Sequence, residues 1–217
     1  MSEIIIISTS ASIEEFLHVR TEEYLEAAET IESLREKILS LDEEIECRRM
    51  VLECVSANKP NWISETFTVP YRCFPHSKRL ANKGVSEMLA LKWLLENEEI
   101  PDEAMIVKHT GRYKLKDNRY SYHLIESTKS GDDAILKRDG HNQVFFGLVA
   151  MRCRIWKDFL SVCDFNYLES RMVNIELALA SFLSSNQINA MEVSSLGLLA
   201  NIANNIEKGI REKSDEW

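Results

Sequence analysis

An apolar stripe near the start of the chain constrains the fold more than any other sequence feature. Hydrophobic residues recur there at steps of three and four: Tyr24, Ala28, Ile31, Leu34, Ile38, Leu41 and Ile45. This spacing predicts one apolar face of a long amphipathic helix, which either covers a sheet or pairs with another helix. The β-branched run Ile4–Ile7 precedes it and predicts a buried strand that runs into a polar loop.

Short strands and amphipathic helices alternate along most of the chain. The sequence predicts further strands at Met50–Val55, Phe67–Cys73, Ala104–Val107, Ala134–Leu136 and Val144–Met151. It predicts further helices at Asn82–Asn97, at 168–182 (through Leu168, Met172, Ile175, Leu179 and Phe182) and at Val193–Ile210. A capping box (Ser12 with Glu15), a loop at Asn58–Ser64 and a turn at Asp139-Gly140 separate some of these elements.

This alternation is typical of an α/β protein with a largely parallel central sheet flanked by helices. We expect one domain over residues 1–217, with a core at about 3–185 and a C-terminal helix at about 190–212.

Charge and composition narrow the function. The net charge is −9, with 35 acidic and 26 basic residues, which argues against nucleic acid as a partner. We expect no transmembrane segment, because no apolar run approaches the roughly 20 residues that a helix needs to span a bilayer. The five cysteines are widely spaced and include no Cys-x-x-Cys pair, so we interpret them as buried thiols of a cytoplasmic protein.

Three polar clusters follow predicted strands: Ser8-Thr9-Ser10, the segment from Glu53 to Asn58, and the segment from Lys108 to Tyr113. Ligands of open α/β sheets bind beyond the carboxyl ends of the strands. Lys108 can neutralise a diphosphate as a point charge and Arg112 as a bidentate fork, while Gly111 lets the backbone approach the ligand. The alternative is a solvated strand end with a turn glycine.

Asn82, Lys83 and Gly84 open a predicted helix, with Glu87 one turn later. Free N–H groups at a helix start favour anions, although the same residues also fit an ordinary N-cap. The sequence contains no Walker loop, no G-x-G-x-x-G and no G-x-S-x-G motif. His109 is a weak candidate for a metal ligand, since a lone histidine is more often a hydrogen-bonding group.

Two of these segments resemble a known pattern. Asn82-Lys83-Gly84-x-x-Glu87, followed by Ile106–Tyr113, is similar to a pattern in small GT-A-type glycosyltransferases. These occur in bacterial surface-polysaccharide clusters and in large algal viruses of the chlorovirus type. The flanking segments Ile4–Ser10, Val51–Glu53, Phe145–Arg152 and Asn174–Glu176 also fit, so the resemblance covers about residues 3–185.

The resemblance implies a GT-A-like domain that moves a sugar from a nucleotide-sugar donor, with a UDP-sugar favoured, to a hydroxyl group. It implies a glycan or glycoprotein acceptor and a cytoplasmic location, in the host cytoplasm if the protein is viral. It also assigns roles to individual residues. Ser8, Thr9, Ser10 and Glu53 would line the nucleoside pocket, Asn82, Lys83, Gly84, Glu87, Lys108 and Arg112 would complete the donor site, and Glu176 would be the catalytic base.

The chain departs from the GT-A pattern in one respect. The Asp-x-Asp metal motif is absent after the strand that ends at Lys108, and Asp132-Asp133 lies too far along to replace it. A divalent cation, Mn or Mg, requires oxygen ligands. Two hypotheses follow. Cationic side chains stabilise the leaving group in place of a metal ion, or carboxylates elsewhere in the chain hold the metal.

Two other functions also fit the sequence. The long apolar stripe would suit a helical interaction or oligomerisation protein. The strand-end clusters would suit a non-catalytic nucleotide-binding module.

Overall fold

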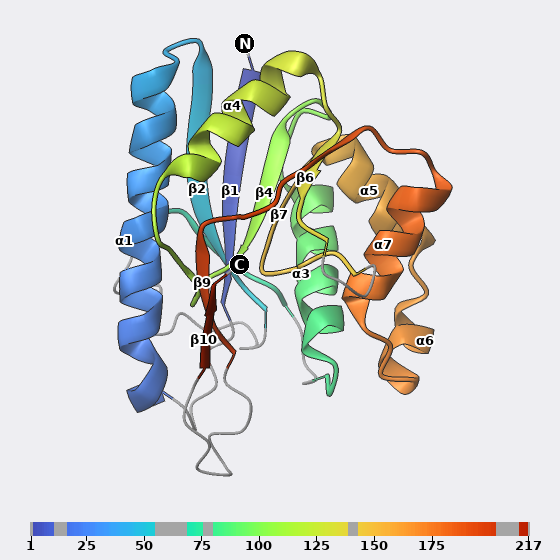
Figure 1. The fold of residues 1–217 in the computed structure, drawn as a ribbon. Coiled ribbons are helices and arrows are strands. Elements are labelled where there is room, and N and C mark those ends of the chain that lie inside the picture. Colours follow the sequence, from blue (N-terminus) through green and yellow to red (C-terminus); the bar gives the residue numbers. More distant parts are fainter. Residues whose placement is uncertain are drawn as a thin grey trace.

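A seven-stranded sheet forms the centre of the protein (Figure 1). The computed structural model describes residues 2–10, 17–54, 69–75, 80–138, 143–202 and 213–216. The strand order is β3-β2-β1-β4-β7-β6-β8. The strands are β1 (Ser2–Ser10), β2 (Ile45–Glu53), β3 (Tyr71–Cys73), β4 (Met105–Thr110), β6 (Ala134–Leu136), β7 (Leu148–Arg152) and β8 (Ala190–Glu192). Only β7 runs antiparallel to its neighbours in this sheet, which confirms the predicted α/β class with a largely parallel sheet.

Helices cover both faces of the sheet. On one face lie α1 (Leu17–Leu41) and α4 (Arg119–Ser130), and on the other lie α3 (Lys83–Asn97), α5 (Cys153–Val162), α6 (Phe165–Ser170) and α7 (Ile175–Ser185). Strand β1 packs against both layers because successive side chains point to opposite faces. Ile4 and Ile6 contact the α1 layer, and Ile5 and Ile7 contact the α3 layer.

The predicted amphipathic helix is α1, and its stripe covers the sheet. Ile31, Leu34 and Ile38 are fully buried in the same cluster as Ile4 and Ile6. These residues are therefore not available as the seam of a coiled coil.

Helix α1 ends earlier than predicted. It stops at Leu41, and Ile45, which we assigned to the helix, already belongs to β2. The Asp42 carboxylate accepts a hydrogen bond from the Glu44 N–H (2.9 Å), a turn that ends the helix without a glycine or proline.

The single helix predicted over 168–182 is wrong. The structure has two helices, α6 and α7, with a break between them. Met172 takes a left-handed conformation (φ 51°) in the break, and Asn174 begins α7 as an N-cap that accepts from the Glu176 N–H (2.9 Å). The apolar spacing continues across the break because both helices pack on the same core.

The predicted C-terminal helix is also wrong over the described part of its range. Residues 190–192 form β8, and β9 (Leu198–Ile202) pairs with β5 (Lys114–Leu115) and β10 (Lys213–Glu216) in a separate three-stranded sheet. Gly197 has a left-handed φ of 63°, and its carbonyl accepts from the Lys116 N–H (2.7 Å). This interruption directs the following residues to pair with β5.

Other predicted elements differ in their bounds. The helix at 82–97 and the strand at Ala134–Leu136 are confirmed. The strand expected at Val144–Met151 begins at Leu148, that at Phe67–Cys73 is reduced to Tyr71–Cys73, and that at Ala104–Val107 extends to Thr110. Helices α4 and α5 were not predicted. Ser12 with Glu15, the loop at 58–64 and the turn at 139–140 lie outside the described residues.

The membrane prediction can be checked on the described helices. Each is too short or too polar to cross a bilayer.

Candidate functional site

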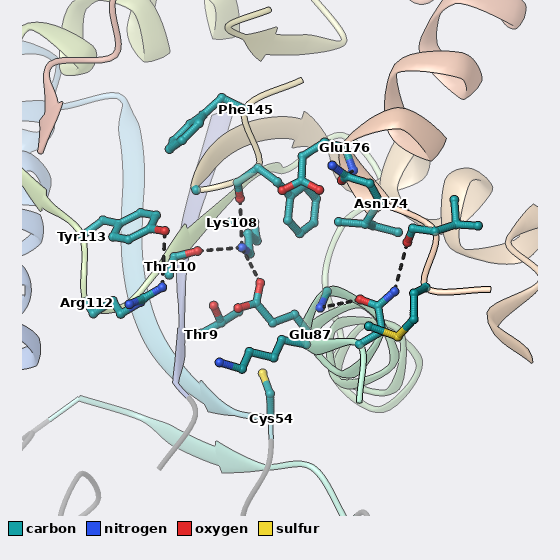
Figure 2. A pocket seen from close by; sticks show the side chains of 18 of the residues that line it. Thr9, Cys54, Glu87, Lys108, Thr110, Arg112, Tyr113, Phe145, Asn174 and Glu176 are labelled. Carbon is teal, nitrogen blue, oxygen red and sulfur yellow. Dashed lines mark hydrogen bonds and ion pairs between the residues drawn. The ribbon is translucent and has the colours of Figure 1, made fainter. Parts of the chain in front are cut away.

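The candidate site lies where the order of the strands reverses. The chain passes from β1 outward through β2 and β3, then returns to the other side of β1 as β4. Open α/β sheets bind ligands at this switch point, beyond the carboxyl ends of the strands. A cavity of about 480 Å³ opens there, with Thr9 at the end of β1 and Thr110 at the end of β4 among its walls (Figure 2).

The cavity brings together residues from segments far apart in the sequence. Its lining residues are Thr9, Tyr24, Cys54, Ala81, Asn82, Lys83, Gly84, Glu87, Lys108, Thr110, Arg112, Tyr113, Phe145, Phe146, Gly147, Met172, Val173, Asn174, Ile175 and Glu176. Those predicted from the sequence are Thr9, Asn82, Lys83, Gly84, Glu87, Lys108, Arg112 and Glu176. Ser8, Ser10, Glu53 and His109 are not among them.

Strand alternation explains which predicted residues reach the cavity. Thr9, Lys108 and Thr110 lie on the α3 side of the sheet, and all three line the cavity. Ser8 and His109 lie on the α1 side, and the Ser8 hydroxyl is 3.2 Å from His109 Nδ1. A strand end therefore delivers only every second residue to the site.

The starts of two helices meet at the cavity wall. The Asn82 side chain caps α3, accepting from the Gly84 N–H (3.1 Å), and its amide donates to the Val173 carbonyl (3.0 Å). A Cβ on Gly84 would lie 2.9 Å from Ile175 Cγ2, so glycine permits the close contact between α3 and α7. Asn82 and Gly84 thus build the wall, and the N-terminal ends of α3 and α7 both lie there.

Lys108 lies fully buried at the floor of the cavity. Its ammonium group contacts Glu87 Oε2 (2.6 Å), Thr110 Oγ1 (2.9 Å) and the Phe146 carbonyl (2.9 Å). It also lies 4.2 Å from the centre of the Phe146 ring, a cation–π contact. In Figure 2 these partners surround the ammonium group.

Arg112 and two aromatic rings form another part of the wall. The Arg112 guanidinium lies 5.1 Å from the centre of the Tyr113 ring, and Tyr113 stacks on Phe145 with 6.3 Å between ring centres. Burial raises the pKa of the Tyr113 hydroxyl, so the ring stays neutral at physiological pH. This wall combines one cation with two flat apolar faces.

Gly111 has a different role from the one predicted. A Cβ on Gly111 would lie 2.6 Å from the Thr9 carbonyl oxygen, and the Gly111 N–H donates to that same oxygen (2.8 Å). Glycine therefore lets the ends of β1 and β4 approach each other rather than a ligand.

Glu53 and Ser10 lie behind the cavity rather than in it. Glu53 is fully buried and accepts a hydrogen bond from the Ser10 hydroxyl (2.7 Å). This pair joins the ends of β1 and β2. The predicted role of Ser8, Ser10 and Glu53 in nucleoside binding stays a prediction, because these side chains lie outside the cavity lining.

His109 is a core residue with both ring nitrogens engaged. Nε2 lies 2.5 Å from the Tyr113 carbonyl oxygen, which can only accept, so Nε2 carries the proton and Nδ1 accepts from Ser8. Burial is the main cause that lowers the pKa of His109, to about 3. With both nitrogens used inside the protein, His109 does not fit a metal ligand.

Metal-binding side chains are not clustered in the part of the chain that the structure describes. Among the described residues, no group of three or more His, Cys, Asp or Glu side chains lies close enough to hold a metal ion. The carboxylates that line the cavity are Glu87 and Glu176, and Glu87 is already paired with Lys108. The need for Mn or Mg therefore stays a prediction to be tested.

Cys54 also lines the cavity, but its thiol is a poor nucleophile. Burial, followed by the negative charges of Glu87 and Glu53, raises the pKa of Cys54 well above its usual value. A thiol in this environment stays protonated.

Several residues of the cavity were not predicted from the sequence. Tyr24 was assigned to the apolar stripe of the long helix, and Phe145 to a flanking segment of the resemblance to glycosyltransferases. Both residues line the cavity. Tyr113 lay inside the predicted cluster but received no role. For Tyr113, the sequence signal that could have indicated a place in the site was the polar segment that follows β4.

The fold and cavity together define an α/β protein with a polar cavity at its switch point, lined by cationic and anionic side chains. The sequence matches no family model and no curated protein.

Solved structures with a similar fold include a protein described as a nucleotide-diphospho-sugar transferase from Desulfovibrio desulfuricans G20. It is 8% identical over 89% of this chain and 80% of that one, with a TM-score of 0.46. Another is 4-diphosphocytidyl-2C-methyl-D-erythritol synthase, 9% identical over 88% of each chain, with a TM-score of 0.49. Both likenesses are distant, and neither assigns a function to this chain.

Proposed function

We propose that the protein is a glycosyltransferase that moves a sugar from a nucleotide-sugar donor, with a UDP-sugar favoured, to the hydroxyl group of a glycan or glycoprotein acceptor. One observation carries the proposal: at the switch point, a single cavity combines two helix N-termini, the cation Arg112 and the carboxylate Glu176. These groups match the two requirements of sugar transfer, which are a stabilised diphosphate and a deprotonated acceptor.

The donor would bind through the charge of its diphosphate and through its nucleobase. Arg112 offers a bidentate fork to the diphosphate, and Lys83, the first residue of α3, adds a second cation at a helix start. The stacked rings of Tyr113 and Phe145 offer a flat apolar surface against which the base can pack.

The transfer step needs a base and a stabilised leaving group. The acceptor oxygen forms a bond to the anomeric carbon while the bond from that carbon to the diphosphate oxygen breaks. Glu176 takes the acceptor proton, and the diphosphate leaves with the bonding electrons next to Arg112. Figure 2 shows Glu176 beside Asn174 and apart from Arg112, which suits an acceptor on the α7 side and a diphosphate on the β4 side.

A cytoplasmic location, in the host cytoplasm if the protein is viral, belongs to the same proposal. All five cysteines are free thiols, which suits a reducing compartment.

A thermal-shift screen with UDP, CDP, ADP and GDP tests donor binding. Ligand at about a hundred times its dissociation constant adds roughly 2.7 kcal/mol of stability. Uridine nucleotides should stabilise the protein most. If no nucleoside diphosphate shifts the melting temperature, the proposal loses its basis.

A turnover assay with UDP-sugars then separates an enzyme from a non-catalytic nucleotide-binding module. Transfer of sugar, or slow hydrolysis of the donor, supports the enzyme. Tight donor binding with neither reaction supports the module.

The same thermal-shift screen, run with and without manganese, tests whether donor binding depends on a divalent metal ion. Because Glu87 is paired with Lys108 and the Asp-x-Asp pair is absent, manganese should improve donor binding less than in a typical GT-A enzyme. Complete loss of donor binding in chelator would contradict this and show that carboxylates hold a metal.

A further inference from the structure

The ammonium group of Lys108 has no N–H left for a ligand while its present contacts hold. A lysine ammonium carries three donors. Glu87, Thr110 and the Phe146 carbonyl supply three acceptors within 2.9 Å. A phosphate oxygen can therefore bind Lys108 directly only if one of these acceptors leaves.

Two of the three acceptors belong to residues whose backbone is held in place next to the sheet. Thr110 is the last residue of β4, and its N–H donates to the Gly147 carbonyl (2.8 Å), next to Phe146 in the chain. The Phe146 acceptor is itself a backbone oxygen. Moving the Phe146 oxygen would open the joint between β4 and the segment before β7, whereas the Thr110 acceptor is a neutral hydroxyl on a short side chain.

Glu87 differs from these two partners. Its carboxylate lies at the end of a flexible side chain on α3, and that side chain is 20% exposed, whereas the Lys108 side chain is fully buried. Glu87 also lines the cavity. Of the three acceptors it is the charged one, and because its charge has the same sign as that of a phosphate, it is the acceptor that a phosphate oxygen can best replace.

We propose that Glu87 is an internal competitor for Lys108, and that a phosphate oxygen of the ligand replaces its carboxylate at the ammonium group. Glu87 then lowers the affinity of the cavity for phosphate-bearing ligands instead of binding the donor. The inference rests on the proposed function for the nucleotide part of the ligand, but its chemistry requires only a phosphate oxygen.

Calorimetry with inorganic pyrophosphate tests this inference, because a competitor and a donor-binding residue give opposite signs. Glu87→Gln keeps the shape of the side chain and removes its charge, so pyrophosphate should bind about tenfold more tightly. In a Lys108→Met background the same change should alter the affinity less than about twofold, because the cation it competes for is gone. Weaker or unchanged pyrophosphate binding by Glu87→Gln, or an equal gain without Lys108, would overturn the inference.

Glu176→Gln is the matched control. It removes the same charge from another residue that lines the cavity. Any gain in pyrophosphate affinity from this change should be the same in the wild-type protein and in the Lys108→Met background. A gain from Glu176→Gln that depends on Lys108 as strongly as that from Glu87→Gln would count against a specific role for Glu87.

Glu87→Asp provides a second test that does not depend on whether the Lys108→Met protein folds. Aspartate keeps the charge but is one methylene shorter, so it loosens the contact with Lys108. We expect a gain in pyrophosphate affinity smaller than that of Glu87→Gln, and tighter binding by neither variant would overturn the inference. The thermal-shift screen with nucleotides tests the proposed function separately. If UDP binds but the Glu87 variants do not change pyrophosphate affinity as expected, only this inference fails. If the Glu87 variants behave as expected but no nucleotide binds, only the proposed function fails.

Discussion

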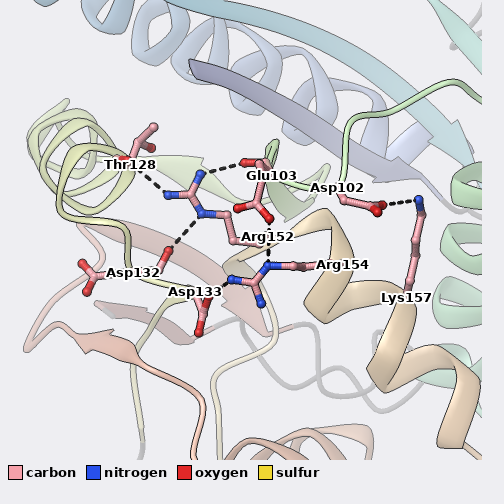
Figure 3. A network of polar contacts seen from close by, with 8 residues as sticks. All are labelled: Asp102, Glu103, Thr128, Asp132, Asp133, Arg152, Arg154 and Lys157. Carbon is pink, nitrogen blue, oxygen red and sulfur yellow. Dashed lines mark hydrogen bonds and ion pairs between the residues drawn. The ribbon is translucent and has the colours of Figure 1, made fainter. Parts of the chain in front are cut away.

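The two edges of the sheet hold their charged residues in different ways. At the carboxyl edge, Lys108 in the cavity contacts the Glu87 side chain. At the opposite edge, Arg152 at the end of β7 lies beside Met105 at the start of β4 and belongs to a polar network (Figure 3). Arg152 donates to the backbone carbonyls of Glu103 (2.7 Å), Thr128 (3.1 Å) and Asp132 (3.1 Å).

The difference separates scaffold from site. The acceptors of Arg152 are main-chain atoms of three segments, so they cannot be exchanged without moving the backbone. Two acceptors of Lys108 are side chains, and one of them is the Glu87 carboxylate, which by our proposal a ligand oxygen replaces. A buried cation with backbone partners therefore indicates a structural joint, and one with an exchangeable carboxylate beside a cavity indicates a binding site.

The largest effect should come from breaking the structural joint. Arg152→Met leaves three carbonyls without their charged donor in a buried place, and should lower the free energy of unfolding by about 3–5 kcal/mol. Arg154→Met is the control, because Arg154 is 40% exposed and pairs with Asp133 and Glu103, a contact worth about 0.2–1 kcal/mol. Chemical denaturation measures both. Equal losses in the two variants would contradict the distinction between the edges.

A smaller effect, on catalysis alone, is expected from Glu176→Gln. If Glu176 is the base, sugar transfer should fall by about 100-fold, or roughly 2.7 kcal/mol, while donor affinity stays nearly unchanged. Turnover and donor calorimetry on the same preparation separate the two effects. A fully active variant would refute the assigned role.

Arg112→Ala should weaken donor binding by about one to two decades, since a charge-assisted bond contributes roughly 1.5–3 kcal/mol. Arg112→Lys should recover only part of this, because the bidentate fork is lost. Lys129→Ala, which removes the same charge from α4, is the control and should leave the affinity unchanged. Donor calorimetry measures all three, and an unchanged affinity in Arg112→Ala would move the phosphate site elsewhere.

The effect that is smallest near neutral pH concerns His109, and it grows as the pH falls. The pKa of His109 is about 3 in the folded protein against an ordinary 6.5, so the unfolded chain takes up this proton first as the pH falls. Stability is therefore lost below about pH 6.5, by up to about 1.4 kcal/mol per pH unit, until the folded form also protonates near pH 3. His109→Gln should show a shallower loss between about pH 6 and pH 4 in urea denaturation at fixed ionic strength. Parallel slopes for the two proteins would show that His109 is not the group responsible.

Local sequence signals predicted much of the fold. The all-apolar run Ile4–Ile7 predicted a buried strand, and it is one of the central strands of the sheet. Asn82 marked the start of α3, because its side chain can satisfy the free N–H groups there. Signals that act over one turn or one strand survive in the tertiary structure when nothing opposes them.

The predictions failed where contacts between distant segments decided the outcome. Residues 198–202 have an apolar spacing that also suits a helix, but β5 supplies a partner strand that the sequence does not reveal. The break at Met172 likewise depends on α6 and α7 packing on one core. The apolar pattern indicates that a side chain is buried. Whether the buried segment forms a helix or a strand depends on the segment that packs or pairs with it.

The sequence by itself placed polar residues after β1, β2 and β4, and the parallel register brought Thr9 beside Thr110 at one edge of the sheet. Only the tertiary structure decided which of them face the cavity. In each strand successive side chains alternate between the two faces, and the strand residues that line the cavity are those on the α3 side. Lys108 therefore lines the cavity, while His109, the next residue along the chain, is buried on the side that α1 covers.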